Sequence, residues 1–325
     1  MPMPLHRRAL LAAPLLLSPL ARAGAAEAFP ERAISVVSGY APGGVTDITS
    51  RAVAERMGQA LSVPMVVENR AGAATAVANT AVAQARPDGY TLLMGTSTLA
   101  INPALQPSLT PKEPMRELAP IGMVFRTAFV LHVHPSVPAK TTAELIAWCR
   151  SNPGKLNFGS SGTGAVNHLA LALFAQRAGI EVTHIPYKGG APALLDLRAG
   201  RIGAMFQAVL EALPSLREGG TRGLAISSAE RSALLPELPP VAEAVPGFDV
   251  VFWQGLFAPA GTPEPVLARL GGALTTATGD AALRARMAEH GVVITTGDAA
   301  ALRQTLAAET TLWGELIRTA NIRPD

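Results

Sequence analysis

The sequence predicts an α/β protein of two domains, each a mainly parallel sheet flanked by helices, with a ligand cleft between them. Short apolar runs alternate with amphipathic segments along the chain, which is the pattern of strands joined by helices. About 300 residues follow the N-terminal segment, more than one hydrophobic core usually holds. A strand, a glycine-rich loop and a helix follow one another once in each half of the chain.

Residues 1–26 have the layout of a cleavable signal peptide. A basic start (His6, Arg7, Arg8) precedes an apolar run at 9–20 and small residues at 21–26. The apolar run is shorter than the roughly 20 residues that span a bilayer. We therefore expect export, with cleavage after Ala23 or a nearby small residue. The Arg7-Arg8 pair is compatible with the twin-arginine route.

The charge of the mature chain is balanced. Of 27 basic residues, Arg7, Arg8 and Arg22 lie in the signal segment, so 27 − 3 = 24 remain against 24 acidic residues. Clusters of Lys and Arg are absent, which argues against a nucleic-acid or membrane-surface partner. Cys149 is the single cysteine, so an intrachain disulfide is excluded, and its helical context predicts a packed side chain.

In the first half of the chain, expected strands alternate regularly with expected helices. Strands are expected at 33–40, 63–69 and 90–96, and helices at 46–61 and from about Ala73 to Ala85. The second helix is stopped by the turn residues at 86–89.

The second half repeats the alternation. Strands are expected at 124–135, 156–161, 182–187, 201–208 and 223–228, and helices at 141–156, 165–179 and 191–200. An extended run at 249–259 is expected to cross back to the first domain, followed by helices at 263–279 and 280–291, a strand at 292–297 and a helix at 298–322. This predicts a discontinuous domain 1 (27–123 plus 250–325) and a domain 2 (124–249).

The two glycine loops, YAPGGVTD and GSSGTGAVNH, are suited to an anion. Each joins the end of a strand to the start of a helix, where free N–H groups and about half a positive charge are presented. In open α/β sheets, ligands bind along that edge. Ser160, Ser161 and Thr163 add hydroxyl donors, and Gly162 and Gly164 allow close approach of a ligand. The alternative is that these residues only cap a helix.

Other chemistries fit these loops less well. The second loop lacks the Gly-Lys-Ser/Thr ending of a phosphate loop, and its glycine spacing differs from the dinucleotide fingerprint. It is one residue short of a G-x-S-x-G nucleophile elbow, which leaves a secreted hydrolase using Ser161 and His168 as the enzymatic alternative. His132 and His134 have strand spacing, and a solvated or packed pair is expected there rather than a metal site. We expect no cofactor, no metal and no catalytic residue.

Six segments in order resemble the Bug-type extracytoplasmic receptors of tripartite tricarboxylate transporters: YAPGGVTDITSRAVAERM, VVENRAGAATAVA, ARPDGYTLLMGT, LNFGSSGTGAVNHLALALF, HIPYKGGAPALLDLRAG and GLFAPAGTP. The resemblance covers essentially the whole mature chain. It implies a periplasmic binding protein of the type II-like fold whose domains close over a small organic acid or amino acid. It also implies delivery to membrane permease subunits by a monomer that is not embedded in the membrane. A receptor that feeds a signalling partner is the alternative output.

The resemblance carries ligand-binding roles onto particular positions of this chain. The expected ligand-binding residues are Tyr40, Pro42, Gly43, Gly44, Thr46, Asp47, Ser97, Thr98, Ser160, Ser161, Gly162, Thr163, Gly164, His168, Tyr187, Lys188, Gly189 and Gln207.

Several of these positions have an alternative role. Asp47 is expected to cap the first helix or to contact an amine, because it would repel an anion. Lys188 is either a solvated loop residue or a counter-ion, and His168 is expected to face the ligand. Ala74 and Ala76 replace glycines usual in the family, which would narrow the cleft or strengthen a helix.

Overall fold

The computed structural model describes residues 29–187, 189–289 and 292–323. The predicted signal peptide and Lys188 lie outside the described residues. Within them, every helix is too short or too polar to cross a membrane.

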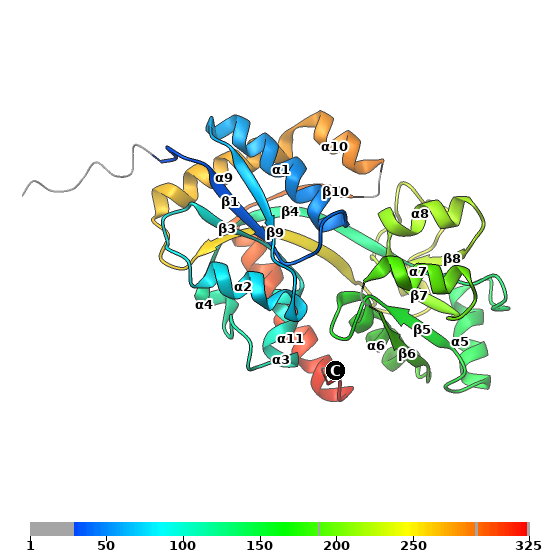
Figure 1. The fold of residues 1–325 in the computed structure, drawn as a ribbon. Coiled ribbons are helices and arrows are strands. Elements are labelled where there is room, and N and C mark those ends of the chain that lie inside the picture. The colour runs from blue at the N-terminus through cyan, green and yellow to red at the C-terminus, as the bar shows by residue number, and fades with distance from the viewer. Residues whose placement is uncertain (1–28, 188, 290–291, 324–325) are drawn as a thin grey trace, which may run out of the picture.

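The N-terminal part forms a parallel sheet covered by helices (Figure 1). Strands β1 (Ile34–Ser38), β2 (Met65–Asn69) and β3 (Thr91–Thr96) lie in the order β2-β1-β3, all parallel. The helical elements here are α1 (Val45–Leu61), η1 (Ala73–Thr75), α2 (Ala76–Ala83), α3 (Thr98–Leu105) and α4 (Pro114–Glu117).

One long strand joins two lobes. Strand β4 (Leu118–Val133) pairs antiparallel with β9 (Val251–Pro259) as far as Ala128, and from Phe129 it pairs with β7 (Ala204–Ala208). We call the part around β1, β2, β3 and β9 the first lobe and the part around β7 the second lobe. Both are visible in Figure 1, linked by the extended ribbons of β4 and β9.

The second lobe repeats the parallel arrangement. Strands β5 (Asn157–Ser160) and β6 (Thr183–Pro186) continue the order β7-β5-β6 in parallel, and β8 (Arg222–Ile226) pairs antiparallel with β4. Its helices are α5 (Thr142–Ser151), α6 (Val166–Ala178), α7 (Gly190–Arg198) and α8 (Val209–Arg217), followed by η2 (Val241–Glu243).

The C-terminal segment returns to the first lobe. Helices α9 (Glu264–Gly279), α10 (Ala281–Ala288) and α11 (Ala299–Thr319) pack there, and β10 (Val293–Gly297) pairs antiparallel with β4. The sheet is therefore mixed. The sets β2-β1-β3 and β7-β5-β6 are parallel, as expected for mainly parallel sheets, whereas β4 and β9 pair antiparallel with their neighbours. The predicted domain limits stay a proposal, since the change of strand partner in β4 comes at Ala128–Phe129.

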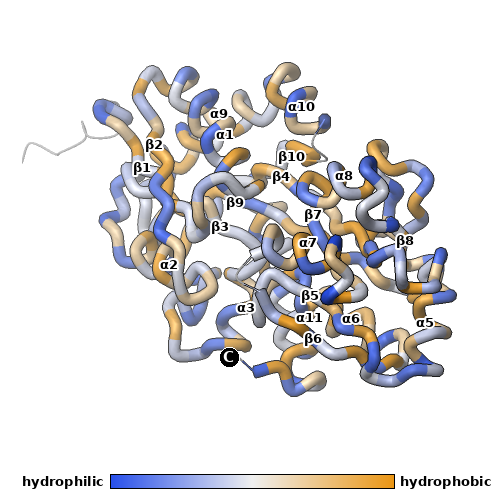
Figure 2. Tube along the Cα trace, turned by 45° about the vertical axis from the view of Figure 1, so that its right-hand side comes forward, coloured by the Kyte–Doolittle hydropathy of each residue, from blue (hydrophilic) through white to orange (hydrophobic). Residues whose placement is uncertain are grey.

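Burial in the core shows a structural role for two residues, Cys149 and His132, whose types could also have served in a reactive or metal site. Cys149 and His132 are completely buried, Cys149 on α5 and His132 on β4. Burial raises the pKa of the Cys149 thiol to about 11 and lowers the pKa of His132 to about 3. His132 lies 3.1 Å from Thr221 Oγ1 in the core, and His134, which is only partly buried, bonds Ser136. Hydrophobic and hydrophilic segments alternate along surface helices such as α1 and α10 (Figure 2).

The structure corrects one helix start and adds three α-helices, namely α3, α8 and the four-residue α4. The α-helix expected from Ala73 begins at Ala76, because Ala73, Ala74 and Thr75 have positive φ angles of 45°, 49° and 74°. Helices α3 and α8 were not expected. Helix α3 contains Pro103 and helix α8 contains Pro214. A proline inside a segment argues against predicting a helix there from the sequence. The packing of α3 against α11 offsets that local cost.

Candidate ligand-binding site

The first glycine loop leaves the end of β1 and enters α1 at the edge of the first lobe. Pro42 and Gly43 are exposed and Gly44 is partly buried, so backbone groups of this loop are open to solvent. Thr46 and Asp47 are buried just inside the helix. The loop itself is thus open to solvent, while the side chains behind it belong to the packed interior.

Asp47 holds this loop in place. Its carboxylate accepts hydrogen bonds from the Gly43 N–H at 3.0 Å, from Arg51 Nε at 3.1 Å and from Asn69 Nδ2 at 2.9 Å. Burial raises the pKa of Asp47, but these donors outweigh burial and the net pKa lies below its usual value. The carboxylate is thus occupied by protein donors, and its bond to the Gly43 N–H lies just before Gly44, the N-cap residue of α1.

A chain of hydroxyl groups runs behind the first loop. Tyr40 OH lies 3.2 Å from Thr96 Oγ1, Thr96 Oγ1 lies 2.9 Å from Thr98 Oγ1, and Thr98 Oγ1 lies 2.7 Å from Thr75 Oγ1. Asn79 Nδ2 donates to Thr75 Oγ1 at 3.1 Å. Burial raises the pKa of Tyr40, so its phenol stays neutral and can donate. The sequence indicated Tyr40 and Thr98 but missed Thr75, Asn79 and Thr96.

The start of α1 is anchored to the sheet by Gln254 of β9. Its amide nitrogen donates to the Thr46 carbonyl oxygen and to Ser50 Oγ, both at 3.0 Å, and its oxygen accepts from Thr49 Oγ1 at 2.7 Å. Gln254 is fully buried. This strand residue, distant in sequence from α1, therefore fixes where the first loop ends.

The second glycine loop, between β5 and α6, is partly open to solvent. Ser161, Gly162 and Thr163 are partly buried, whereas Ser160 and Gly164 are buried. Gly162 and Gly164 have positive φ angles of 135° and 79°, which favour glycine. Ser161 Oγ donates to Asn167 Oδ1 at 2.8 Å, and the amide of Asn167 donates to the Phe206 carbonyl oxygen.

Two stacked histidines support that loop. The rings of His168 and His184 lie 3.9 Å apart with an interplanar angle of 8°. His168 Nδ1 accepts from the Gly164 N–H at 3.1 Å, and His184 Nε2 lies 2.7 Å from Ser160 Oγ. The buried His168 side chain therefore holds the loop backbone at Gly164 in place. His184 and Asn167 were missed by the sequence analysis, although His184 lies in the quoted HIPYKGG segment.

The hydrolase alternative finds little support in this geometry. Ser161 bonds Asn167 rather than His168, so its hydroxyl is not activated by that imidazole. Ser160 does approach an imidazole, but it is fully buried and a substrate carbonyl has no access to its hydroxyl.

The second lobe holds three further residues that were predicted to bind the ligand: Tyr187 and Gly189 between β6 and α7, and Gln207 on β7. Tyr187 OH donates to Asp196 Oδ2 at 2.7 Å, and burial together with Asp196 raises the pKa of Tyr187 to about 12. Gln207 Nε2 lies 3.1 Å from Glu211 Oε2, and the Gln207 oxygen is buried with no hydrogen-bond partner in the described structure. Burial raises the pKa of Glu211.

The lobes touch where the second loop meets α3. A Cβ placed on Gly164 would collide with Leu105 Cδ2, and Gln176 of α6 bonds Thr319 of α11 at 3.2 Å. Leu105 ends the helix that begins beside Ser97 and Thr98. The second loop is therefore brought against the helix that starts at predicted site residues of the first lobe.

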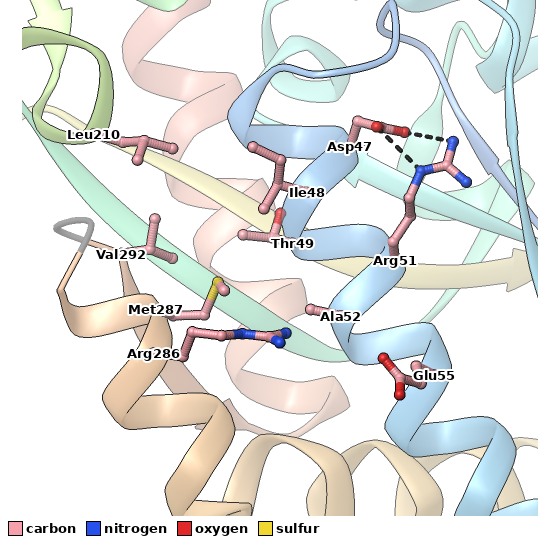
Figure 3. Close-up of a pocket in the computed structure, with 10 residues that line it drawn as sticks. All are labelled: Asp47, Ile48, Thr49, Arg51, Ala52, Glu55, Leu210, Arg286, Met287 and Val292. Carbon is pink, nitrogen blue, oxygen red and sulfur yellow. Dashed lines mark hydrogen bonds and ion pairs between the residues drawn. The ribbon is translucent and has the colours of Figure 1, made fainter.

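A pocket of about 480 Å³ opens between α1, α10 and the start of α8 (Figure 3). It is lined from the first lobe by Asp47, Ile48, Thr49, Arg51, Ala52, Glu55, Arg286, Met287 and Val292, and from the second lobe by Leu210. Asp47 alone among the predicted site residues lines it. In Figure 3 the Asp47 carboxylate is turned toward Arg51. The other predicted residues that the structure describes lie outside this pocket.

Two α/β lobes joined by extended strands, with donor-rich loops at the strand ends, define a solute-binding protein of the periplasmic type. The chain belongs to the family described as the tripartite tricarboxylate transporter family receptor, whose profile matches residues 49–322. It is 34% identical to Protein BugT of Bordetella pertussis over 298 residues, which cover 90% of each chain.

Two solved structures show the same fold. R. palustris Rpa4515 with adipate superposes with a TM-score of 0.83 at 31% identity, covering 91% of this chain and all of that one. MatC from Rhodopseudomonas palustris with bound malate gives a TM-score of 0.80 at 32% identity, with 89% and 100% coverage.

Proposed function

We propose that this protein is an extracytoplasmic receptor that captures a small organic anion between its lobes and delivers it to a tripartite tricarboxylate-type permease. The observation that carries the proposal is the pair of glycine loops at the carboxyl ends of β1 and β5. Both loops lead into the positive end of a helix, and both have partly open residues, at Gly44 and at Ser161–Thr163. Adipate and malate in the two R. palustris structures support a carboxylate as the ligand class.

The side chains favour binding over turnover. The Ser161 hydroxyl is bonded to Asn167, and the hydroxyls of Thr96 and Thr98 are bonded to each other, so the polar side chains beside the open edge have fixed positions. The lobes are expected to close by bending where β4 changes partner, near Ala128–Phe129. We propose that the mature protein acts as a monomer in the periplasm.

A thermal-shift screen of organic acids, starting with adipate and malate, followed by calorimetry, tests the proposal. A ligand at 100 times its Kd should add about 2.7 kcal/mol to the free energy of unfolding. Ser161→Ala should weaken binding without unfolding the protein, because Ser161 is partly exposed. Ser136→Ala, at an exposed position beside His134, is the matched control and should bind normally. Turnover of an ester substrate that is lost in Ser161→Ala would overturn the receptor assignment.

A further inference from the structure

A row of five hydrogen-bonded side chains in the first lobe leads from the buried interior to the open edge. It runs through Asn79, Thr75, Thr98, Thr96 and Tyr40, with heavy-atom distances between successive members of 3.1, 2.7, 2.9 and 3.2 Å. The first four residues are at most 6% exposed, whereas Tyr40 is partly open to solvent and stands just before the exposed part of the first glycine loop. We call these five residues the hydroxyl row.

Asn79 gives the hydroxyl row a direction. Its amide nitrogen donates to Thr75 Oγ1, and an amide nitrogen does not accept. Each threonine hydroxyl has a single proton, so Thr75 directs its proton to Thr98, the other neighbour of its oxygen. By the same count Thr98 donates to Thr96, and Thr96 donates to the phenol oxygen of Tyr40. The protons therefore point outward, from the interior toward the edge of the lobe.

The opposite direction would leave a proton without an acceptor in the interior. If Tyr40 donated inward, the Thr75 proton would face the amide hydrogens of Asn79. Among the described residues, Thr75 Oγ1 has Asn79 and Thr98 as its hydrogen-bond partners, and neither would then accept. A buried donor without an acceptor costs the full desolvation penalty of that group, so the outward direction is the stable one.

Packing fixes the heavy atoms at both ends of the hydroxyl row. A Cβ on Gly39, directly after β1, would lie 2.6 Å from Thr75 Cβ, so the Thr75 side chain packs against the end of that strand. The Tyr40 ring packs edge-on against Phe252 of β9, with ring centroids 6.4 Å apart. What Asn79 controls is therefore the direction of the protons.

We propose that Asn79 is a positioning residue that, through the hydroxyl row, makes Tyr40 a hydrogen-bond donor to a carboxylate of the captured anion. The inference rests on the proposed function and deepens it by naming the ligand group that this edge selects. Thr96 is the partner of the Tyr40 hydroxyl among the described residues, and because Tyr40 accepts from it, the phenol proton is left for the ligand. Successive donations polarise the hydroxyls in one sense, which strengthens the last donor. With the row reversed, Tyr40 would offer a lone pair and suit an ammonium group.

The first arm of the test uses the ligand-free protein. In the Raman spectrum, the intensity ratio of the tyrosine ring doublet is high when the phenol oxygen accepts and low when its proton is donated to a protein acceptor. The chain supplies both references, because Tyr90 OH accepts from the Glu31 N–H, whereas Tyr187 OH donates to Asp196. Subtracting the spectra of Tyr40→Phe, Tyr90→Phe and Tyr187→Phe from that of the wild type isolates each tyrosine. Tyr40 should resemble Tyr90, and a ratio like that of Tyr187 would overturn the inference.

Two near-isosteric changes at Asn79 separate direction from packing. Asn79→Asp supplies an acceptor for the Thr75 proton and should reverse the row, which lowers the Tyr40 ratio. Burial raises the pKa of a carboxyl group by up to about 3–5 units, so spectra are taken up to about pH 9 to ionise the new carboxylate. Asn79→Leu removes the donor without supplying an acceptor, so the Tyr40 ratio should stay high. The same ratio in wild type and Asn79→Asp throughout would contradict the inference, and the wild-type spectrum decides the direction even if Asn79→Asp fails to fold.

The second arm measures adipate binding by calorimetry. Tyr40→Phe should bind adipate at least about tenfold more weakly, since a hydrogen bond to a charged group is lost. Asn79→Asp should lose a similar factor at about pH 9, whereas Asn79→Leu should lose much less. In a Tyr40→Phe background Asn79→Asp should have little further effect, which separates reversal of the row from charge repulsion. Thr80→Val, which removes the neighbouring α2 hydrogen bond to the Thr110 carbonyl, is the matched control and should bind normally.

The failure of this inference and that of the proposed function look different. Losses that add in the double variant, or a larger loss in Asn79→Leu than in Asn79→Asp, would show that Asn79 acts on packing alone and would overturn the inference. If no acid of the screen binds the wild type, the proposed function fails, whereas a Tyr40 ratio like that of Tyr187 overturns only the direction of the hydroxyl row.

Discussion

Gly164 of the second lobe and Leu105 of the first are in direct contact, with no room between them for a Cβ on the glycine. The contact joins the second glycine loop to the end of α3, so a larger residue at position 164 would have to displace the Leu105 side chain.

Gly164→Ala should therefore weaken ligand binding. The added methyl both strains a backbone with φ of 79° and pushes Leu105 away, which disfavours the closed arrangement of the lobes. Calorimetry should show at least about a tenfold lower affinity, equivalent to about 1.4 kcal/mol.

Gly179→Ala is the matched control. Gly179 also has a positive φ, 60°, but a Cβ there meets no other atom. It should lower stability by about 1 kcal/mol through backbone strain and leave the affinity unchanged. Equal affinity losses in the two variants would show that the interlobe contact is not the cause.

Ala74→Gly should stabilise the protein. Ala74 has a φ of 49°, in the left-handed region that glycine occupies without steric cost, so removing its methyl should gain about 0.5–1 kcal/mol. Ala76→Gly should have the opposite sign and a similar size, because Ala76 has an ordinary φ of −60°. Urea unfolding of both variants measures the difference, and a loss of stability in Ala74→Gly would contradict the strain assigned to this turn.

Gln254→Leu should cost about 2–4 kcal/mol of stability, because the Thr46 carbonyl and the Thr49 and Ser50 hydroxyls lose a buried partner. Gln207→Leu is a milder comparison in the second lobe. The Gln207 nitrogen has longer bonds of 3.1 and 3.4 Å and its oxygen is already without a partner, so its loss should cost less. Chemical denaturation ranks the two, and the reverse order would contradict the anchoring role of Gln254.

Asp47 should make part of the stability dependent on pH in the acidic range. Its folded-state pKa lies below the unfolded value, so its contribution is present above the unfolded pKa and is lost as pH falls through the folded pKa. Asp47→Asn should lower stability at pH 7 by about 1–2 kcal/mol and flatten the loss below pH 4. Denaturation at a series of pH values measures this. Asp88→Asn, which changes a more exposed ion pair with Arg32, should retain the wild-type profile.

Much of the fold was predictable because its signals are local. The alternation of apolar and amphipathic runs located the strands that became β1 to β3 and β5 to β10 and most of the helices, and both glycine loops lie at strand ends as expected. Helices α3 and α8 were missed because prolines at 103 and 214 mask helices that tertiary packing stabilises. The predicted site residues stay predictions, but His184, Asn167 and Thr75 emerged only when segments far apart in sequence were placed together.

The sequence by itself determined the α/β class, the family and the two donor loops, since these depend on periodicity, turn residues and motif order along a continuous stretch of chain. Only the tertiary structure decided that β4 belongs to both lobes and that Gln254 fixes the start of α1. The bonds of Gln254 join residues about two hundred positions apart. Periodicity along the chain carries no information on which distant residues share a buried, poorly solvated space, and that space is what shifts a pKa or positions a loop.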